Sequence, residues 1–502
     1  MEIIEQTLLS NIDLAKLKSI FLYQAGNPLL FNTGLFLFLF LGFLFVYNYL
    51  SKTRYPKMIF VILFSLYFYY KSSAECCFLL LGVCLSDYIL ARLLHSTTSN
   101  LCRRLIVAVN VLSNVGMLIY FKYFELLLST FANITSTSFS PLDIVLPAGI
   151  SFFTFRSISY IVDVYRGVMK PVTNIFEYIF FLTFFPPLLA GPVVRAKDLI
   201  PQIQQNTPAT NSMIGEGFFL IMTGLFKKVV IADYISGNFV DRIFDNPSLY
   251  SGFENLIGMY GFTIQLYCDF SGYSDMAIGI ALILGYRFMD NFDSPFKSQN
   301  PTEFWRRWHI SLSSWLRDYI YIPMGGSRSG RLRSRLNLLN TMVIGGLWHG
   351  ASWMFLIWGA WNGLLLILHK ELKAIFTFKL FYNSFKNTRK VFNIIITFTL
   401  ISFGMIFFRA GSMEQVNDML TQIFSNFHLS VAPQFISGYT MITLTIIVAL
   451  VLHFSPHKWT ISLQEKYIKM PTLIQGIVLA AVIFLIIQVR QSDIVPFIYL
   501  QY

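Results

Sequence analysis

Apolar runs separated by short polar connections recur along the whole of this 502-residue chain. A helix that crosses a bilayer needs about 20 mostly apolar residues, so runs of this kind predict membrane-spanning helices. In the first part of the chain the runs cover residues 34–50, 58–70, 77–94 and 105–120. Later runs cover residues 214–226, 257–284, 338–368 (a broken pair), 391–408, 439–453 and 473–487.

Proline and glycine interrupt the apolar pattern from about residue 141 onward. The clearest interruptions are LPAG at residues 146–149 and PPLLAGP at residues 186–192. Irregular backbone at membrane depth is tolerated only where protein or water covers it. We therefore expect these segments to be either re-entrant elements that line a cavity, or kinked spans and interfacial loops.

The composition supports the membrane interpretation. The chain is 55% hydrophobic and 13% charged, whereas soluble globular proteins carry about 25% charged residues. The predicted fold class is therefore an all-α polytopic membrane protein. No polar stretch is long enough for a separate soluble domain of about 100–150 residues, so we expect a single integral-membrane domain over residues 1–502.

The formal net charge of +12 does not indicate a nucleic-acid partner, because Lys and Arg concentrate in the cytoplasmic loops of membrane proteins. Lys52, Arg54 and Lys57 follow the first apolar run and place that side in the cytoplasm. Residues 125–143 contain no Lys or Arg and are expected outside. These charges predict an external N-terminus. A polar stretch precedes the first apolar run, which is the wrong order for a cleaved signal peptide, so the first span is expected to be retained. The cysteines form no CxxC pair and predict buried apolar side chains rather than a metal site.

The densest group of polar residues within the apolar pattern lies between residues 265 and 361. Asp269 and Asp275 interrupt an apolar run there, and an ionisable residue at membrane depth is costly and indicates a functional site. Asp269 and Tyr273 are four positions apart and share one face if the segment is helical. The candidate roles are a proton relay, a partner for an arginine, the orientation of a histidine, or a structural hydrogen-bond network.

The segment FWRRWHISLSSWLRDY at residues 304–319 has the spacing of one amphipathic helix. Its aromatic and apolar stripe consists of Trp305, Trp308, Leu312, Trp315 and Tyr319. Trp and Tyr favour the membrane–water boundary, so we expect this helix to lie at an interface. His309 falls between the two faces, where a structural histidine and a catalytic histidine both fit.

A basic loop rich in glycine and serine follows this segment. Its four arginines within eight residues are Arg328, Arg331, Arg333 and Arg335. The charge argument places the loop in the cytoplasm. The arginines are candidates for binding an anionic headgroup or the phosphates of an acyl carrier, and the alternative is that they only determine the topology.

His349 is the sharpest candidate for chemistry. It follows Trp348 in the sequence GGLWHG at residues 345–350 and precedes a long apolar run, so it is expected within the bilayer. Gly346 and Gly350 form a GxxxG step that permits close helix approach. A neutral imidazole in a dry pocket can accept a proton from a hydroxyl, as general-base catalysis requires. A structural histidine is the alternative.

Eight segments together resemble the membrane-bound O-acyltransferase (MBOAT) family, in its bacterial branch similar to alginate O-acetyltransferase. They are LPAGISFFTF (146–155), YIVDVYRG (160–167), AGPVVR (190–195), FKKV (226–229), DFSGYSD (269–275), residues 304–317, YIPMGG (321–326) and GLWHG (346–350). The matches keep their order over most of the chain. The sequence departs from the family at Arg156 and Pro187, where the resemblance predicts glutamine.

The resemblance implies a bundle of roughly eleven transmembrane helices, with re-entrant and interfacial helices around a central tunnel. The core motifs cover about residues 140–410. His349 matches the family's essential histidine, and His309 matches a second signature position with a supporting role. Supporting site or tunnel candidates are Asp269, Tyr273, Asp275, Trp305, Arg317 and Trp348, with a pairing of Asp269 and Arg317 as one hypothesis. No metal is implied.

The implied activity is transfer of an acyl group, in the first place acetyl, across the membrane to hydroxyls of a cell-envelope or secreted polysaccharide. The donor is a cytoplasmic thioester, acetyl-CoA or an acyl carrier protein, and no cofactor is bound. The expected surroundings are the lipids of the bacterial cytoplasmic (inner) membrane and an extracytoplasmic acyltransferase partner. Transfer is direct or runs through an acyl relay, for which Tyr499 in the aromatic tail is the candidate. The alternative is that this tail only anchors the last span.

A second hypothesis is a transporter or flippase for an envelope precursor, with Asp269 and Asp275 as an intramembrane proton relay. Inverted repeats are typical of secondary transporters. We find no similarly interrupted pair of segments in the two halves of the chain, which favours the acyltransferase.

Overall fold

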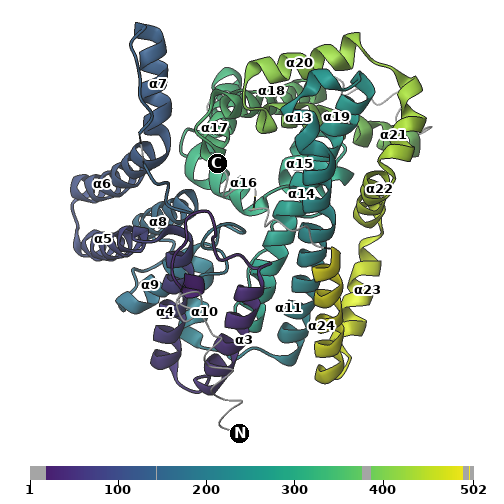
Figure 1. Ribbon diagram of the computed structural model, residues 1–502. Helices are drawn as coiled ribbons and strands as arrows, with labels where there is room; N and C mark the ends of the chain where they lie inside the picture. Colours follow the sequence, from purple (N-terminus) through teal and green to yellow (C-terminus); the bar gives the residue numbers. More distant parts are fainter. Residues whose placement is uncertain (1–18, 143, 329, 376–385, 490–496, 498–502) are drawn as a thin grey trace. The chain divides into compact units, whose positions relative to one another are not determined.

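A computed structural model of the protein describes residues 19–142, 144–328, 330–375, 386–489 and residue 497. All regular secondary structure in these residues is helical (Figure 1), which confirms the predicted all-α class. Contacts divide the chain into two compact units. The first comprises Met1–Glu125, Ser138–Leu189 and Arg195–Pro208, and the second Leu126–Thr137, Ala190–Val194 and Ala209–Tyr502.

In the first unit, four helices follow the predicted apolar runs: α3 (Gly34–Tyr49), α4 (Arg54–Ser73), α5 (Cys76–Ser96) and α6 (Asn100–Leu118). The unit also contains η1 (Ile119–Tyr123) and three helices outside those runs, α8 (Ile150–Tyr165), α9 (Ile175–Thr183) and α10 (Ala196–Gln205). Helix α7 (Phe124–Thr135) continues from α6 through the π-helical turn η1. In α3, Phe36, Phe40 and Phe43 share one face and are buried, whereas Phe38 and Phe45 are exposed.

The two interrupted segments are covered by protein. Gly149 has a left-handed backbone with φ of 69°, and a Cβ atom there would lie 2.5 Å from the carbonyl oxygen of Leu188. The LPAG turn therefore packs directly against the second interrupted segment. Phe185 of that segment is fully buried, with its ring centroid 5.7 Å from those of Phe43 and Phe68. This is the protected setting that irregular backbone at membrane depth requires.

The two departures from the family pattern are both buried. Arg156 of α8 has no exposed surface, and its guanidinium lies 4.8 Å from the centre of the Phe181 ring. Pro187 lies in the buried stretch after α9. Arg156 therefore brings a cation into the core of the first unit, where its contact is with an aromatic face.

The second unit is built around α14 (Gly252–Ile283), which is buried along most of its length. Before it come α11 (Asn211–Leu225), η2 (Phe226–Ala232), α12 (Asp233–Ile235), η3 (Ser236–Val240), α13 (Asp241–Asp245) and η4 (Pro247–Leu249). A Cβ atom on Gly224 would lie 2.5 Å from the carbonyl oxygen of Gly272, and one on Gly217 would lie 2.6 Å from that of Gly279. Pairs of glycines thus let α11 and α14 approach closely.

The remaining helices of this unit follow α14 in the sequence. They are η5 (Pro295–Lys297), α15 (Pro301–Arg307), α16 (Ile310–Leu316), η6 (Arg317–Tyr321), α17 (Arg331–His349), α18 (Trp353–Ile375), α19 (Lys386–Arg409), α20 (Met413–Ser425), η8 (Leu429–Val431), α21 (Ala432–Gly438), α22 (Thr440–Phe454), α23 (His457–Ile468) and α24 (Thr472–Val489). Among them, α19, α20 and α22 pack against α14. The predicted broken pair at 338–368 is confirmed, because α17 ends at His349 and α18 begins at Trp353. The glycine steps act across this pair: a Cβ atom on Gly359 would lie 2.5 Å from the carbonyl oxygen of Met342.

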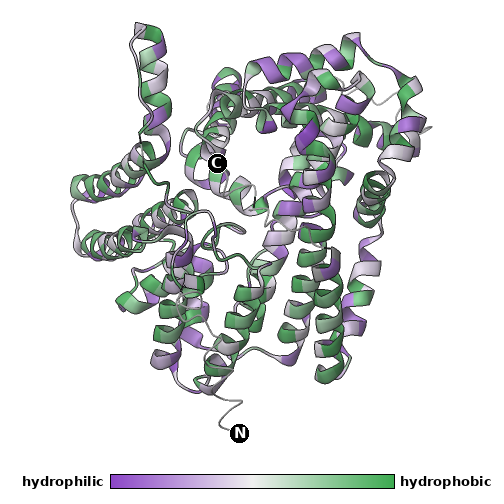
Figure 2. Ribbon diagram, viewed as in Figure 1, coloured by the Kyte–Doolittle hydropathy of each residue, from purple (hydrophilic) through white to green (hydrophobic). Residues whose placement is uncertain are grey.

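Hydrophobic residues predominate along many of the helices (Figure 2), and large apolar side chains such as Phe45, Phe78 and Leu112 are exposed. By length and composition alone, three described helices can cross a membrane: Cys76–Ser96, Asn100–Thr135 and Asn387–Arg409. The bent pair Leu429–Gly438 and Thr440–Phe454 raises this number to four. The count of roughly eleven spans and the central tunnel remain predictions.

Candidate active site

The backbone breaks at His309, where the sequence predicts a continuous helix. Helix α15 ends at Arg307, α16 begins at Ile310, and His309 between them has a left-handed backbone with φ of 42°. The prediction of one amphipathic helix with a single aromatic stripe is therefore wrong. Trp308 and Trp315 are 2% and 3% exposed, so they belong to the protein core and not to a membrane–water interface.

A neighbouring loop causes this break. The N–H of Ile310 donates to the carbonyl oxygen of Asn291 at 2.9 Å, and the N–H of Asp293 donates to that of Arg307, also at 2.9 Å. These long-range hydrogen bonds replace those of a continuous helix. A left-handed non-glycine residue is unfavourable by itself and persists only where its surroundings enforce it.

Asn291 also determines the protonation of the His309 ring. Its Oδ1 accepts from the backbone N–H of Ser311 at 3.3 Å and from the Ser311 hydroxyl at 2.8 Å. Its Nδ2 donates to Ser274 Oγ at 3.1 Å. Because a backbone N–H can only donate, the atom that faces Ser311 is the oxygen. His309 Nδ1 lies 3.1 Å from the same oxygen and must therefore carry the hydrogen, which leaves Nε2 as a proton acceptor.

The acceptor nitrogen of His309 lies in an apolar environment. The side chain is fully buried, and within the described residues no hydrogen-bond partner contacts Nε2. The ring makes an edge contact with Phe270 at a centroid distance of 4.6 Å. A neutral, held imidazole of this kind can accept a proton or a hydrogen bond from a hydroxyl that enters the site.

The structure brings His349 to the same place. His349 is the last residue of α17 and is 5% exposed. Its ring centroid lies 4.9 Å from that of Trp358 and 5.1 Å from that of Phe408. The Trp348 ring contacts both histidines, at 5.0 Å from His349 and 5.9 Å from His309. The two predicted histidines thus both contact the ring of one tryptophan.

Trp305 belongs to the same aromatic cluster. Its ring centroid lies 5.8 Å from that of Trp358. The supporting candidate Trp348 therefore contacts His349 directly, and Trp305 is linked to it through Trp358.

The acidic candidates on α14 form ion pairs with lysines. Lys228 is 1% exposed, and its Nζ lies 2.6 Å from Asp269 and 2.7 Å from Asp233. The adjacent Lys227 lies 2.6 Å from Asp275. The hypothesis that Asp269 pairs with Arg317 is wrong, because Arg317 pairs with its neighbour Asp318 at 2.7 Å. Lys227 and Lys228 belong to the FKKV segment, one of the segments that resemble the family. The sequence did not indicate which carboxylates these lysines would pair with.

Tyr273 lies beside this charged group and meets a residue from the end of the chain. The ring of Phe497 is 1% exposed and lies 4.2 Å from that of Tyr273, centroid to centroid. Lys228 Nζ lies 4.6 Å from the centre of the same Phe497 ring. The relay candidate Tyr499 lies outside the described residues.

The four arginines of the basic loop divide into two groups. Arg331 and Arg335 form ion pairs with Glu371 of α18, and Arg335 does so at 2.7 Å. Arg328 and Arg333 have exposed side chains. Glu371 therefore already neutralises part of the charge that the sequence offers for phosphate binding.

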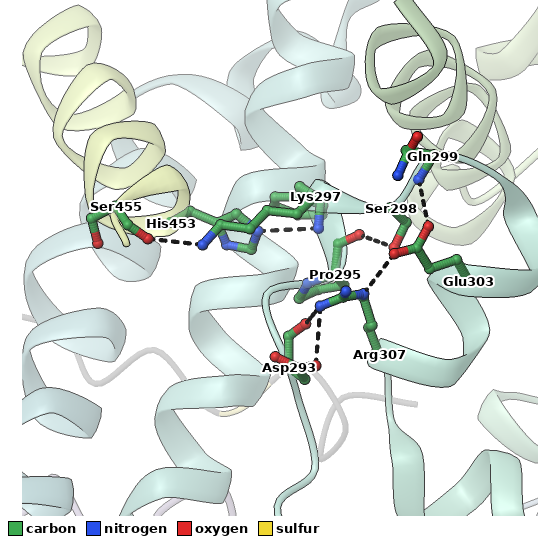
Figure 3. A network of polar contacts seen from close by, with 10 residues as sticks. Asp293, Pro295, Lys297, Ser298, Gln299, Glu303, Arg307, His453 and Ser455 are labelled. Carbon is green, nitrogen blue, oxygen red and sulfur yellow. Dashed lines mark hydrogen bonds and ion pairs between the residues drawn. The ribbon is translucent and has the colours of Figure 1, made fainter. Parts of the chain in front are cut away.

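Sequence reasoning missed Asn291 and the network that anchors its loop (Figure 3). Arg307 donates to Asp293 Oδ2 at 3.0 Å and to Glu303 Oε1 at 3.1 Å, which ties the loop to α15. On the other side, His453 Nε2 of α22 accepts from the N–H of Phe296 at 3.1 Å. In the sequence, the only feature that points to this loop is that residues 285–300 are mainly polar and lie between two apolar elements.

Metal chemistry has no candidate site in the part of the chain that the structure describes. No three His, Cys, Asp or Glu side chains there form a group able to hold a metal ion. The candidate catalytic groups in the described residues are the side chains of His309 and His349.

Comparison with known proteins identifies the family of this chain. A model of the membrane-bound O-acyltransferase family matches residues 20–410. The chain belongs to the MBOAT family. As an MBOAT protein it is a membrane acyltransferase, and the family resemblance drawn from the sequence motifs is confirmed.

Relatives of this MBOAT chain are named for acylation of envelope polymers. The probable alginate O-acetylase AlgI of Pseudomonas aeruginosa is 40% identical over 404 residues, which cover 79% of this chain and 75% of that protein. The peptidoglycan O-acetyltransferase of Helicobacter pylori is 36% identical over 423 residues, covering 78% of this chain and 79% of that protein. The teichoic acid D-alanyltransferase of Bacillus subtilis is 27% identical over 271 residues, covering 52% and 68%.

Replacement of Asn291 by alanine should reduce acyl transfer at least about tenfold, because His309 then loses the acceptor that fixes its tautomer. The amount of purified protein at equal expression should change little. The matched control is Asn300→Ala, which removes the N-cap of α15 but no contact to a histidine. Acyl transfer rates of the two purified variants test this. Equal losses in both would show that only general loop stability matters.

Replacement of Lys228 by methionine should destabilise the fold by about 3–5 kcal/mol, because the buried Asp269 and the partly buried Asp233 each then lose an ion-pair partner. Lys227→Met is the control, since Lys227 and Asp275 are partly exposed and pairs of that kind contribute about 1 kcal/mol or less. Thermal unfolding of both variants in detergent gives the comparison. Similar stabilities would contradict the proposed role of Lys228.

Proposed function

We propose that this chain transfers an acyl group, in the first place acetyl, from a cytoplasmic thioester to a hydroxyl of a cell-envelope or secreted polysaccharide. Acetyl-CoA or an acyl carrier protein is the proposed donor, and the bacterial inner membrane is the proposed location. The observation that carries the proposal is the arrangement of His309 and His349 around Trp348 in a chain of the MBOAT family. Alginate and peptidoglycan, which relatives are named for acetylating, are polymers with hydroxyl groups.

The proposed reaction needs one base and one acceptor of hydrogen bonds. His349 takes the proton of the attacking hydroxyl while the hydroxyl oxygen forms a bond to the thioester carbonyl carbon. The carbon–sulfur bond then breaks, and the leaving thiolate takes the proton back from the His349 imidazolium. His309 Nε2 accepts a hydrogen bond from a second hydroxyl of the acceptor sugar and so orients the sugar, since Asn291 holds the ring in that tautomer. The products are an oxygen ester and a free thiol.

The charged residues of α14 support this function rather than a transporter. Asp269 and Asp275 each lie 2.6 Å from a lysine. Carboxylates held in ion pairs are stabilised in their charged form, which suits a structural role better than that of a proton relay.

Replacement of His349 by alanine should abolish acyl transfer, with a loss of about a hundredfold or more for removal of a general base. The control is His428→Ala, because His428 is exposed and bonds only to Asn426 among the described residues. Transfer of radiolabelled acetyl from acetyl-CoA by purified protein measures the loss. Full activity of the His349→Ala protein would exclude the mechanism.

The route of the acyl group beyond the histidines is a further part of the proposal. In one route Tyr499 accepts the acetyl group as a phenyl ester and passes it to an extracytoplasmic acyltransferase partner. The described residue Phe497, two positions before Tyr499 in the sequence, lies against Tyr273 and Lys228. In this route Tyr499→Phe should lose transfer to the polymer, and intact-mass measurement after incubation with donor should find an added acetyl group only with Tyr499 present. Unchanged transfer by Tyr499→Phe would favour the direct route.

A further inference from the structure

The loop that carries Asn291 contains a strained residue of its own. Ser294, three positions after Asn291, has a left-handed backbone with φ of 44°, and Pro295 follows it. A left-handed backbone is unfavourable for a residue other than glycine and persists only where the surrounding structure enforces it. The position of Asn291 therefore depends on the contacts that hold this loop on the two sides of Ser294.

The contacts before Ser294 come from α15 and are partly open to solvent. Arg307 Nη1 donates to Asp293 Oδ2 at 3.0 Å and to the carbonyl oxygen of Asp293 at 3.1 Å. The side chain of Arg307 is 30% exposed and that of Asp293 is 64% exposed. Because solvent competes for exposed ion pairs, a pair of this kind stabilises a conformation only weakly.

The contacts after Ser294 come from α22, and the first of them is buried (Figure 3). The N–H of Phe296 donates to His453 Nε2 at 3.1 Å, and the two residues are 3% and 8% exposed. Phe296 is the second residue of the short helix η5, and the first N–H groups of a helix have no acceptor inside it. His453 supplies the acceptor. Lys297 Nζ adds a hydrogen bond at 2.8 Å to the carbonyl oxygen of Ser455, the C-cap of α22.

This hydrogen bond fixes the chemical form of His453. A backbone N–H can only donate, so Nε2 is an acceptor without a hydrogen and Nδ1 carries the hydrogen of the neutral ring. Neither an aliphatic side chain nor an imidazolium could accept the N–H of Phe296. The contact therefore requires a side chain with an acceptor at the position of Nε2.

Ring packing connects His453 to the residue beside Asn291. The His453 ring centroid lies 4.7 Å from that of Phe296 and 4.9 Å from that of Tyr267. The Tyr267 ring in turn lies 5.7 Å from that of Phe292, which follows Asn291 in the sequence. His453 thus supports the loop directly at Phe296 and through Tyr267 at Phe292.

We propose that His453 is a positioning residue for His309. By accepting the N–H of Phe296, it holds the strained loop in the conformation in which Asn291 contacts His309 Nδ1. His453 acts through the loop and not on the reacting atoms. Its importance for acyl transfer rests on the proposed function, whereas its effect on the His309 ring does not.

Three substitutions at His453 test the acceptor. His453→Leu removes it. His453→Gln places an amide oxygen near the position of Nε2, whereas the shorter His453→Asn reaches only the position of Nδ1. Because small displacements of a positioned group lower the rate strongly, His453→Leu and His453→Asn should each lower kcat of acetyl transfer about tenfold, and His453→Gln should keep kcat within about twofold. The KM for acetyl-CoA should change less than about twofold in all three, since His309 is proposed to contact the acceptor sugar.

Nitrogen NMR of the full chain labelled with ¹⁵N-histidine measures the effect on His309 without any acyl donor. The chain has only 7 histidines, and the His309 signals are identified by their loss in His309→Gln. In the unmodified protein and in His453→Gln, Nδ1 of His309 should carry the hydrogen and Nε2 should not. In His453→Leu and His453→Asn, the two nitrogens should shift toward each other as both tautomers become populated.

The matched control removes a buried hydrogen bond of the same kind elsewhere in the second unit. The Tyr467 hydroxyl of α23 donates to the carbonyl oxygen of Gln475 in α24 at 2.9 Å, and Tyr467 is 5% exposed. Tyr467→Phe should lower the thermal unfolding temperature but leave kcat and the His309 signals unchanged. This control separates a general loss of stability from a loss of position at His309.

Two results would overturn the proposal. Unchanged His309 signals in both His453→Leu and His453→Asn would show that the loop does not need this acceptor. Equal shifts in His453→Gln and His453→Leu would show that the ring matters only through its packing. The proposed function fails separately: if the unmodified protein transfers no acetyl group while the His309 signals respond to His453→Leu, the positioning of His309 by His453 stands without it.

Discussion

The hydrogen bonds of one asparagine hold the candidate active site together. Asn291 Oδ1 receives the backbone N–H and the hydroxyl of Ser311 and faces His309 Nδ1, while its backbone oxygen receives the N–H of Ile310. Ser311 Oγ in turn accepts from the N–H of Val193 at 2.9 Å. Without these bonds the left-handed backbone of His309 would relax into the helix that the sequence favours. The ring would then lose both its position and its fixed tautomer.

The same constraint governs the other polar groups of the molecule. In a bilayer there is no water to satisfy a buried donor, acceptor or charge, so each needs a partner within the protein. Lys228 lies between Asp233 and Asp269, and Lys227 takes Asp275. Helix packing is limited by the same environment. Lipid tails contact apolar side chains as favourably as another helix does, so apolar contact alone does not drive two helices together. Close contacts between glycines, such as Gly224 with Gly272, hold α11 and α14 together instead.

Much of this could be predicted from the sequence, since apolar length and the spacing of motifs are local properties. The runs at 34–50 and 439–453 appear as α3 and α22 with ends within one residue of the prediction. Motif order identified the MBOAT family, and it selected His309, His349, Trp305 and Trp348, which the structure gathers into one aromatic cluster. The predicted helix at 304–319 was wrong because periodicity measures only what the segment itself prefers.

By itself the sequence determined that this is a membrane protein, that it is helical, which family it belongs to and which two histidines to test. Only the tertiary structure decided how those histidines are held, because the partner of His309 is Asn291, eighteen positions away, and the partner of Asp269 is Lys228 rather than Arg317. Hydrogen bonds and ion pairs between distant segments depend on how helices pack. That packing is set by the whole set of contacts, so it cannot be read from the local pattern of apolar and polar residues.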